Sequence, residues 1–294
     1  MDQLTLPPVR NVDGAVQLPG SKSLSNRILL LAAFARGETE VHNLLESDDT
    51  KHMIDSLRNL GTSLVLSDDG TRCSVTGLGG PFPCNQADLY LGASGTDIRL
   101  LCSAVCLGNG VFSLTGDPRM FESPIRDLVE PLTALGAEFE YLRNEGYPPL
   151  QVKASGLKGK QSYVRGNISS QYLTSLLVSA PMMLEEFSIN VEGELVSKPY
   201  IDMTVEMIRR FGVDVINDQY QVFRIPRSNG YESPGKALVE GDASSATYFL
   251  SAAAIKGGTV RVNGVGVDSV QGDIEHATVL EKMGATVRWG PDWI

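Results

Sequence analysis

The chain has 294 residues, 42% of them hydrophobic, and a formal net charge of −10. This size and composition are those of a globular protein with one large or two mid-sized domains, and no apolar run approaches the length of a membrane span. The acidic balance argues against a nucleic-acid partner, which needs a basic face, but it allows a small anionic substrate held by a few local cations.

The sequence predicts a cytoplasmic setting without a metal site. The N-terminus has no basic region followed by an apolar core, so no signal peptide is expected. No two cysteines form a CxxC pair and histidines are few, which is typical of reduced thiols and argues against a His-rich metal centre. These residues are Cys73, Cys84, Cys102, Cys106, His42, His52 and His276.

One pattern occurs four times along the chain. A glycine followed by small hydroxyl residues opens each copy, at spacings of 72, 74 and 75 residues, and an apolar residue followed by glycine closes it, at spacings of 75, 76 and 72 residues. Two marks that keep one period predict a duplicated structural unit. The opening glycines are Gly20, Gly92, Gly166 and Gly241, and the closing glycines are Gly61, Gly136, Gly212 and Gly284.

The first copy shows the order of elements in this unit. A strand precedes a buried helix, a second strand and an amphipathic helix, where Met53, Leu57 and Leu60 share one face. A hairpin follows, with its turn at residues 68–70. The predicted bounds are 15–18, 25–35, 39–44, 49–60, 63–66 and 72–76.

The later copies repeat this order and predict an α/β (α+β) fold of β-α-β-α-β-β units. Pro131 is expected to kink or weaken the second helix of copy two. Copy four reaches its first hairpin strand at residues 286–289, and the second strand is missing. Further strands are predicted at 112–114, 187–191, 237–239 and 259–262, and further helices at 125–135, 201–208 and 274–283.

The glycine–hydroxyl turns are candidate anion sites, because each one stands at a helix N-terminus. Lys22 and Arg27 flank three serines in the first turn, which favours an anion pocket there over plain capping. Residues 166–171 offer hydroxyl and amide groups without a charge, and residues 241–244 are interpreted as a plain cap. Residues 197–200 add a hydroxyl, a cation and an aromatic ring, or simply a proline turn.

Two further arginines are weaker candidates. Arg99, taken alone, is interpreted as a solvated surface residue, and Arg119 can pair with Asp117 or Glu122. The chain has no P-loop, no GxGxxG motif and no Ser-His-Asp order with credible spacing.

At these residues the chain resembles the 5-enolpyruvylshikimate-3-phosphate synthase (EPSP synthase, 3-phosphoshikimate 1-carboxyvinyltransferase) family, lacking its C-terminal third. The likeness runs from Leu4 to Trp293. Several motifs together make it specific, and they lie at residues 18–27, 168–174, 195–202 and 239–246.

The resemblance implies a transferase of the shikimate pathway, on the route to chorismate and the aromatic amino acids. The enolpyruvyl group of phosphoenolpyruvate moves to the 5-hydroxyl of shikimate 3-phosphate, with release of phosphate, by addition and elimination without a metal or organic cofactor. It also implies a two-domain fold, with a complete domain of three units at residues 21–239 and a partial domain from 1–20 plus 240–294. A monomer that closes on its substrates is expected.

The resemblance also implies the site residues. Lys22 meets both substrates, and Gly95 and Gln171 face phosphoenolpyruvate. Around shikimate 3-phosphate it implies Ser23, Arg27, Ser169, Ser170, Gln171, Ser197 and Tyr200. Weaker candidates are Thr96, Arg99, Arg119 and Lys198.

The chain departs from the family at its phosphoenolpyruvate side. Ala93 and Leu100 replace the usual asparagine and proline, and Ser123 replaces an arginine that holds phosphoenolpyruvate. Losing such a charge-assisted partner costs about 1.5–3 kcal/mol of binding. The general base and a Lys-Glu pair belong to the absent C-terminal part, so weak or no catalysis is expected of this chain alone, and its glyphosate sensitivity is an open question.

Three alternatives stay open. The UDP-N-acetylglucosamine enolpyruvyl transferase shares the fold, although residues 169–171 and 197–200 favour the shikimate enzyme. The chain can also be a non-catalytic anion-binding module or a half-enzyme that needs a C-terminal fragment in trans. It can finally be an incomplete product without a separate function.

Overall fold

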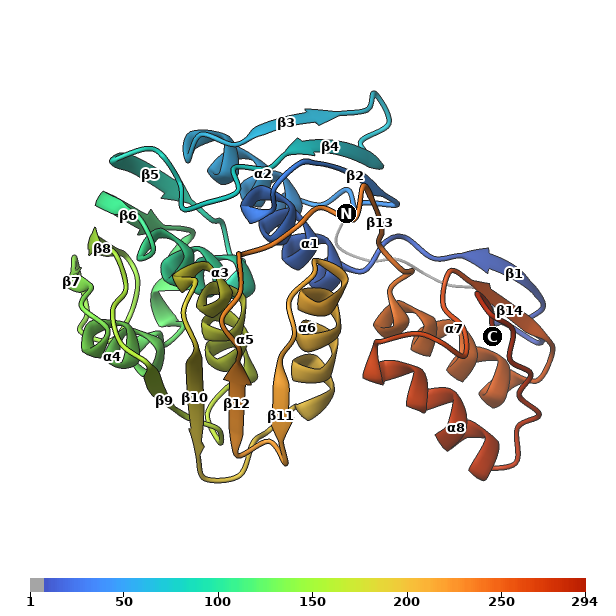
Figure 1. The fold of residues 1–294 in the computed structure, drawn as a ribbon. Coiled ribbons are helices and arrows are strands. Elements are labelled where there is room, and N and C mark those ends of the chain that lie inside the picture. Colours follow the sequence, from blue (N-terminus) through green and yellow to red (C-terminus); the bar gives the residue numbers. More distant parts are fainter. Residues whose placement is uncertain (1–7) are drawn as a thin grey trace. The chain divides into compact units, whose positions relative to one another are not determined.

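The computed structural model describes residues 8–294 and groups them into two compact units. One unit runs from Lys22 to Val239, and the other joins the residues up to Ser21 with Glu240–Ile294. Figure 1 traces both along the chain. Residues 1–7 lie outside the described part. The predictions that concern them, the lack of a signal peptide and their place in the second domain, are therefore not tested.

The unit Lys22–Val239 contains three four-stranded sheets of identical topology. In each sheet the first two strands are parallel and the remaining pairs are antiparallel. The three sheets therefore confirm the predicted repeat of the fold. In spatial order they are β13 (Lys236–Leu238), β2 (Glu38–His42), β4 (Arg72–Thr76) and β3 (Ser63–Leu66); β5 (Gln86–Tyr90), β6 (Asn109–Thr115), β8 (Leu150–Ser155) and β7 (Glu138–Tyr141); β9 (Gln161–Arg165), β10 (Phe187–Glu192), β12 (Val222–Ile225) and β11 (Ile216–Asp218).

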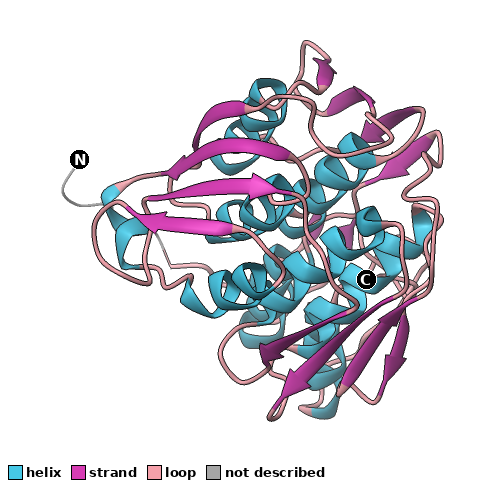
Figure 2. Cartoon of the chain, turned by 60° about the vertical axis from the view of Figure 1, so that its left-hand side comes forward, coloured by secondary structure: helices cyan, strands magenta, loops and turns pink. Residues whose placement is uncertain are grey.

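The helices of this unit lie on the inner side of its sheets (Figure 2). Three of them follow the glycine–hydroxyl turns and are buried over nearly their whole length, with several polar side chains buried among the apolar ones: α1 (Lys22–Phe34), α3 (Gly95–Val105) and α5 (Ser170–Ser179). The second helix of each copy buries one face only. These helices are α2 (Asp48–Asn59), α4 (Arg126–Ala134), which contains Pro131, and α6 (Lys198–Arg210). Two short 3-10 helices are η1 (Pro118–Glu122) and η2 (Ala180–Met183).

The closing glycine of each copy has a conformational role. A left-handed residue after the last helical turn lets the chain reverse into the next strand, and only glycine adopts it without a steric cost. The φ angles are +96° at Gly61, +106° at Gly136, +83° at Gly212 and +105° at Gly284. The period of this mark in the sequence is therefore the period of one helix end in the fold.

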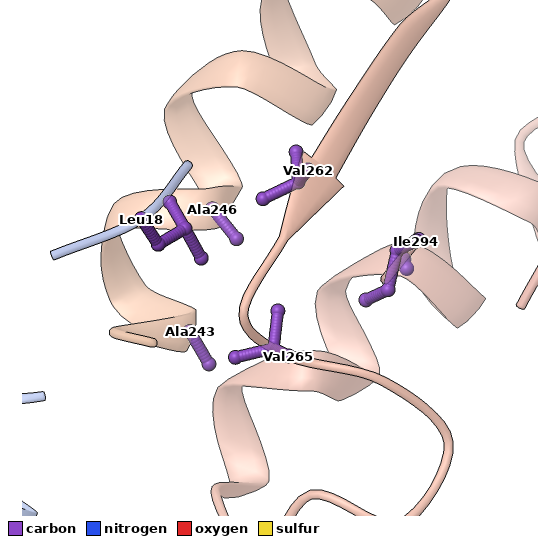
Figure 3. Packing of buried hydrophobic residues seen from close by; sticks show 7 residues of the cluster. Leu18, Ala243, Ala246, Val262, Val265 and Ile294 are labelled. Atoms are coloured by element: carbon purple, nitrogen blue, oxygen red, sulfur yellow. The ribbon is translucent and has the colours of Figure 1, made fainter. Parts of the chain in front are cut away.

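The other unit is built around a two-stranded parallel sheet of β1 (Gly14–Gln17) and β14 (Val260–Asn263). Its helices are α7 (Ala243–Lys256) and α8 (Glu275–Lys282), with the 3-10 turn η3 (Gly272–Ile274) before α8. A small apolar core joins these elements, and Figure 3 shows side chains from this core. Its buried members are Leu18, Ala243, Ala246, Val262, Val265, Ala277 and Ile294.

The strand predicted at residues 286–289 is wrong, since these residues have no regular secondary structure. Residues 293–294, a few positions further on, pair with β14 instead. Val262 and Ile294 exchange backbone hydrogen bonds of 2.8 and 3.0 Å, and Trp293 forms an antiparallel bridge with Asn263. Residues 293–294 thus take the place that β4 holds beside β2 in the first copy.

The strands that open copies one and four are exchanged between the two units. β13 precedes copy four in the sequence, yet it pairs with β2 of copy one. β1 precedes copy one and pairs with β14 of copy four. The chain therefore passes between the units twice, after Ser21 and after Val239.

Candidate active site

Arg27 is the most buried cation among the predicted site residues, with 2% of its surface exposed. Its Nε donates to Thr204 Oγ1 at 3.0 Å and its Nη1 donates to the Ser23 carbonyl at 2.8 Å. Burial lowers the pKa of Arg27 to about 10, against the opposing influence of Tyr200 and Asp97. The guanidinium thus stays charged at neutral pH and is held in one orientation.

Arg27 joins α1 to α6 through a row of hydroxyl groups. Thr204 Oγ1 lies 2.7 Å from the Tyr200 carbonyl, to which it donates, and 3.3 Å from Thr174 Oγ1 on α5. Tyr200 itself is half-buried on the first turn of α6. Sequence reasoning missed Thr204, although its place one turn after Tyr200 is the signal that points to it.

Lys22 starts α1 and keeps its ammonium accessible. Its side chain is 53% exposed, and Nζ lies 3.0 Å from Asp49 Oδ2 at the start of α2. Ser23 follows and is half-buried. The first turn of α1 contains no acidic residue, so its free N–H groups and Lys22 together favour an anion.

Arg99 is not a solvated surface residue, and this interpretation from the sequence is wrong. It is 7% exposed, and it donates to the Gly95 carbonyl at 2.5 Å and to the Pro124 carbonyl at 2.8 Å. The guanidinium also lies 5.5 Å from the ring centre of Tyr172, whose hydroxyl donates to the same Pro124 carbonyl. Arg99 therefore fixes the start of α3 against the segment that follows Ser123.

The start of α5 meets the start of α3. Ser169 caps α5 by accepting a hydrogen bond from the Gln171 N–H at 3.2 Å, and Ser170 is buried behind it. The Gln171 amide donates to Thr96 Oγ1 at 3.4 Å. A Cβ atom on Gly95 would lie 2.6 Å from Arg99 Nη1, so the absence of a side chain there leaves room for the Arg99 guanidinium.

The start of α6 carries exposed polar groups. Ser197 has a left-handed backbone with φ of 55° and makes no side-chain cap. Lys198 places its ammonium 5.4 Å from the ring centre of Tyr220, whose hydroxyl donates to Asp202 at 2.8 Å. Lys198 is thus oriented by an aromatic ring, while Ser197 faces solvent.

Arg119 does not form the ion pairs that the sequence suggested. Asp117 instead accepts a hydrogen bond from the Tyr90 hydroxyl, and within residues 8–294 the structure shows no ion pair from Arg119 to Asp117 or Glu122. Arg119 is exposed on η1, four residues before the half-buried Ser123.

Side-chain contacts link the N-terminal halves of α1 and α6, and the N-terminal turns of α5 and α3. Arg27 and Thr204 link α1 with α6, and Gln171 and Thr96 link α5 with α3. The assembled groups are two cations, several hydroxyls and an amide beside helix N-termini, a composition suited to phosphate and carboxylate groups. In the described part of the chain, no cluster of His, Cys, Asp or Glu is suited to a metal ion, and no helix is both long and apolar enough to span a membrane.

Comparison with known proteins identifies the family of this chain. The family model described as EPSP synthase (3-phosphoshikimate 1-carboxyvinyltransferase) matches residues 6–294. A relative named 3-phosphoshikimate 1-carboxyvinyltransferase from Marinomonas sp. is 54% identical, and one of that name from Vibrio vulnificus is 55% identical. Each alignment covers 100% of this chain and 69% of the relative.

Solved structures agree with this result. EPSP synthase from Acinetobacter baumannii superimposes with a TM-score of 0.81 at 27% identity, over 98% of this chain and 64% of that one. The enolpyruvyl transferase NikO from Streptomyces tendae shares the fold, with a TM-score of 0.70 at 18% identity, over 97% of this chain and 65% of that one. The chain thus spans slightly less than two thirds of these structures, and it belongs to the EPSP synthase family.

Proposed function

We propose that the protein transfers the enolpyruvyl group of phosphoenolpyruvate to the 5-hydroxyl of shikimate 3-phosphate and releases phosphate. The observation that carries this proposal is the buried, oriented Arg27, which joins α1 to α6, with Lys22 exposed at the start of α1. Two substrates with two phosphates and two carboxylates require such a concentration of donors and positive charge.

The reaction can be divided into two steps. The 5-hydroxyl oxygen loses its proton and adds to C2 of the enol phosphate while C3 gains a proton, which gives a tetrahedral intermediate. Loss of phosphate from C2 and of a proton from C3 then restores the double bond. Negative charge persists on the phosphate and carboxylate groups throughout, and we assign the residues of this chain to its stabilisation and to substrate positioning.

We assign the shikimate 3-phosphate half of the site to the starts of α1, α5 and α6. Arg27 and Lys22 supply charge, Ser170 and Ser197 supply hydroxyl groups, and Tyr200 supplies a ring and a phenol. Ser23, Ser169 and Gln171 complete this half. Oriented donors lose little entropy on binding, which favours the held Arg27 over a mobile surface cation.

We assign the phosphoenolpyruvate half to Lys22, Gly95, Thr96 and Gln171. Arg99 supports this half by holding the Gly95 carbonyl, and it does not contact the substrate in our assignment. Arg119 is an exposed cation four residues before Ser123, and we assign it as a weaker candidate for this half. We assign Lys198 as an outer contact for the shikimate half.

The remaining proposals concern the whole protein. We infer a cytoplasmic enzyme without a cofactor and without a nucleic-acid partner, in keeping with the net charge of −10. We also infer that the two compact units correspond to the two domains of the family, which are expected to close on the substrates as a monomer.

Calorimetric titration of the 294-residue chain tests the substrate recognition that the proposal requires, since weak or no catalysis is expected of this chain alone. Shikimate 3-phosphate is titrated first, phosphoenolpyruvate is then titrated into the same cell, and UDP-N-acetylglucosamine is titrated into a separate sample. Binding of shikimate 3-phosphate with no response to the UDP-sugar is the expected result. Binding of the UDP-sugar alone, or of neither ligand, contradicts it.

A further inference from the structure

A buried polar pair links α1 to α3 directly behind the proposed site. Asn26 and Asp97 are both 0% exposed, and the Asn26 amide donates to Asp97 Oδ1 at 2.5 Å. Among the described residues, Asp97 Oδ2 and Asn26 Oδ1 have no hydrogen-bond partner although both atoms are buried. A buried acid that lacks part of its hydrogen bonds is costly, so its presence requires an explanation.

The surroundings of Asp97 favour the protonated form of its carboxyl group. Burial is the main cause that raises the pKa of Asp97, to about 8, and the charge of Asp49 adds to it, while a Ser94 hydrogen bond and the charges of Lys22 and Arg27 oppose it. These three charged groups are the ones that face Asp97, from α2 and from α1. At neutral pH the group is therefore a neutral acid.

Asp97 also stands next to the proposed phosphoenolpyruvate half of the site. It occupies the first turn of α3, directly after Gly95 and Thr96. Thr96 accepts the hydrogen bond of Gln171 from α5, and Asn26 lies one residue before Arg27 on α1. A shift of Asp97 would move this turn relative to both neighbouring helices.

We propose that Asp97, paired with Asn26, is a positioning residue that holds the first turn of α3 against α1 and thereby keeps the phosphoenolpyruvate half of the site in place. This inference rests on the proposed function of the same site. Lys22, Arg27 and Asp49 together carry a single net positive charge, which attracts an anion. Ionisation of Asp97 cancels this charge and draws Lys22 inward, so it weakens binding of the anionic substrate.

The test measures phosphoenolpyruvate affinity, in the presence of shikimate 3-phosphate, between pH 6.5 and 9.5. For the wild-type chain the affinity is expected to be level up to about pH 8 and then to fall toward a limit of about tenfold per pH unit. Asp97→Asn keeps the shape of the side chain without an ionisable group, so its affinity should stay level. Asp68→Asn, in an exposed turn, is the matched control and should behave as the wild type does.

A second measurement does not depend on any ligand. Amide hydrogen exchange at Ile98, whose N–H donates to the Ser94 carbonyl at 3.2 Å, should be faster in Asp97→Ala than in the wild type at pH 7, and Asp97→Asn should restore slow exchange. Equal exchange in all three proteins overturns the positioning role. An identical fall in affinity with pH in Asp97→Asn and the wild type overturns the role of the neutral form.

Measurements that need no ligand separate this inference from the proposed function. If neither substrate binds to the wild-type chain, the proposed function fails. A carbon-13 titration of the aspartate carboxyl groups then still decides the protonation state, because it needs no substrate. An Asp97 carboxyl that titrates near pH 4 overturns the inference whether or not the substrates bind.

Discussion

At the scale of single residues, Arg27 shows how burial turns a cation into an oriented binding group. Its Nε donates to Thr204 of α6 and its Nη1 donates to the Ser23 carbonyl of α1, so the side chain is held to both helices. An exposed arginine would lose side-chain entropy on binding a phosphate, whereas Arg27 has lost it during folding.

Arg27→Gln is therefore expected to weaken shikimate 3-phosphate binding by about ten- to a hundredfold, since a charge-assisted hydrogen bond contributes about 1.5–3 kcal/mol. Arg36→Gln is the matched control, because Arg36 is exposed and pairs with Glu232. Calorimetry measures the affinities, and thermal unfolding shows whether each variant folds. An unchanged affinity in a folded Arg27→Gln variant would remove Arg27 from the site.

Asp97 gives a prediction about stability and pH. Its pKa is about 8 in the folded chain and about 4 in an unfolded one, so the folded state holds a proton that the unfolded state releases between these values. The free energy of unfolding therefore falls as the pH rises from 4 to 8, by at most about 1.4 kcal/mol per pH unit, and this contribution is constant above pH 8.

Asp97→Asn lacks that contribution. Its melting temperature relative to the wild type should rise steadily between pH 5 and pH 8 and stay constant from pH 8 to pH 9. A constant difference in melting temperature between the two proteins over this pH range would show that Asp97 titrates normally.

At the scale of elements, the repeat made much of the fold predictable. The hairpin strands at 63–66 and 72–76 are found where the pattern placed them, because alternating burial and an Asp-Asp-Gly turn are local signals. The exchange of β1 and β13 between copies was not visible from the repeat, because strand pairing over more than 190 residues leaves no local mark. The same limit hid the Asn26–Asp97 contact, which spans 71 residues.

Gly136→Ala tests the closing glycine of the unit. A Cβ atom there would meet nothing nearer than 3.9 Å, so the cost of the substitution comes from the φ of +106° and is expected to be about 1–2 kcal/mol. Gly80→Ala is the control, since Gly80 has open space around it and no positive φ. Denaturant unfolding should show a lower free energy of unfolding for Gly136→Ala only. Equal stability of both would contradict a conformational role.

At the scale of the whole molecule, the two units differ in how well their helices are covered. In the unit Lys22–Val239 the first helix of each copy is buried on nearly all sides. In the other unit α7 is equally apolar in sequence, yet only Ala243 and Ala246 are buried. The exposed fractions of Tyr248 and Ile255 are 77% and 78%.

This uncovered face of α7 has a physical consequence. Contiguous apolar surface of this kind is normally an interface, and its contact with water costs about 25 cal/mol for each Å². The family resemblance implies a monomer, whereas this exposed face of α7 favours association. We therefore expect the 294-residue chain to self-associate as its concentration rises.

Sedimentation velocity over a hundredfold range of concentration measures the association. The double variant Tyr248→Gln/Ile255→Gln should shift the equilibrium toward the monomer, because it removes apolar surface from α7 without touching the small core of that unit. Val65→Gln is the matched control, as Val65 is 65% exposed on β3 in the other unit, and it should associate as the wild type does. A wild-type chain that stays monomeric throughout would mean that exposure of these side chains does not drive association. Equal association in all three proteins would place the contact elsewhere on the surface.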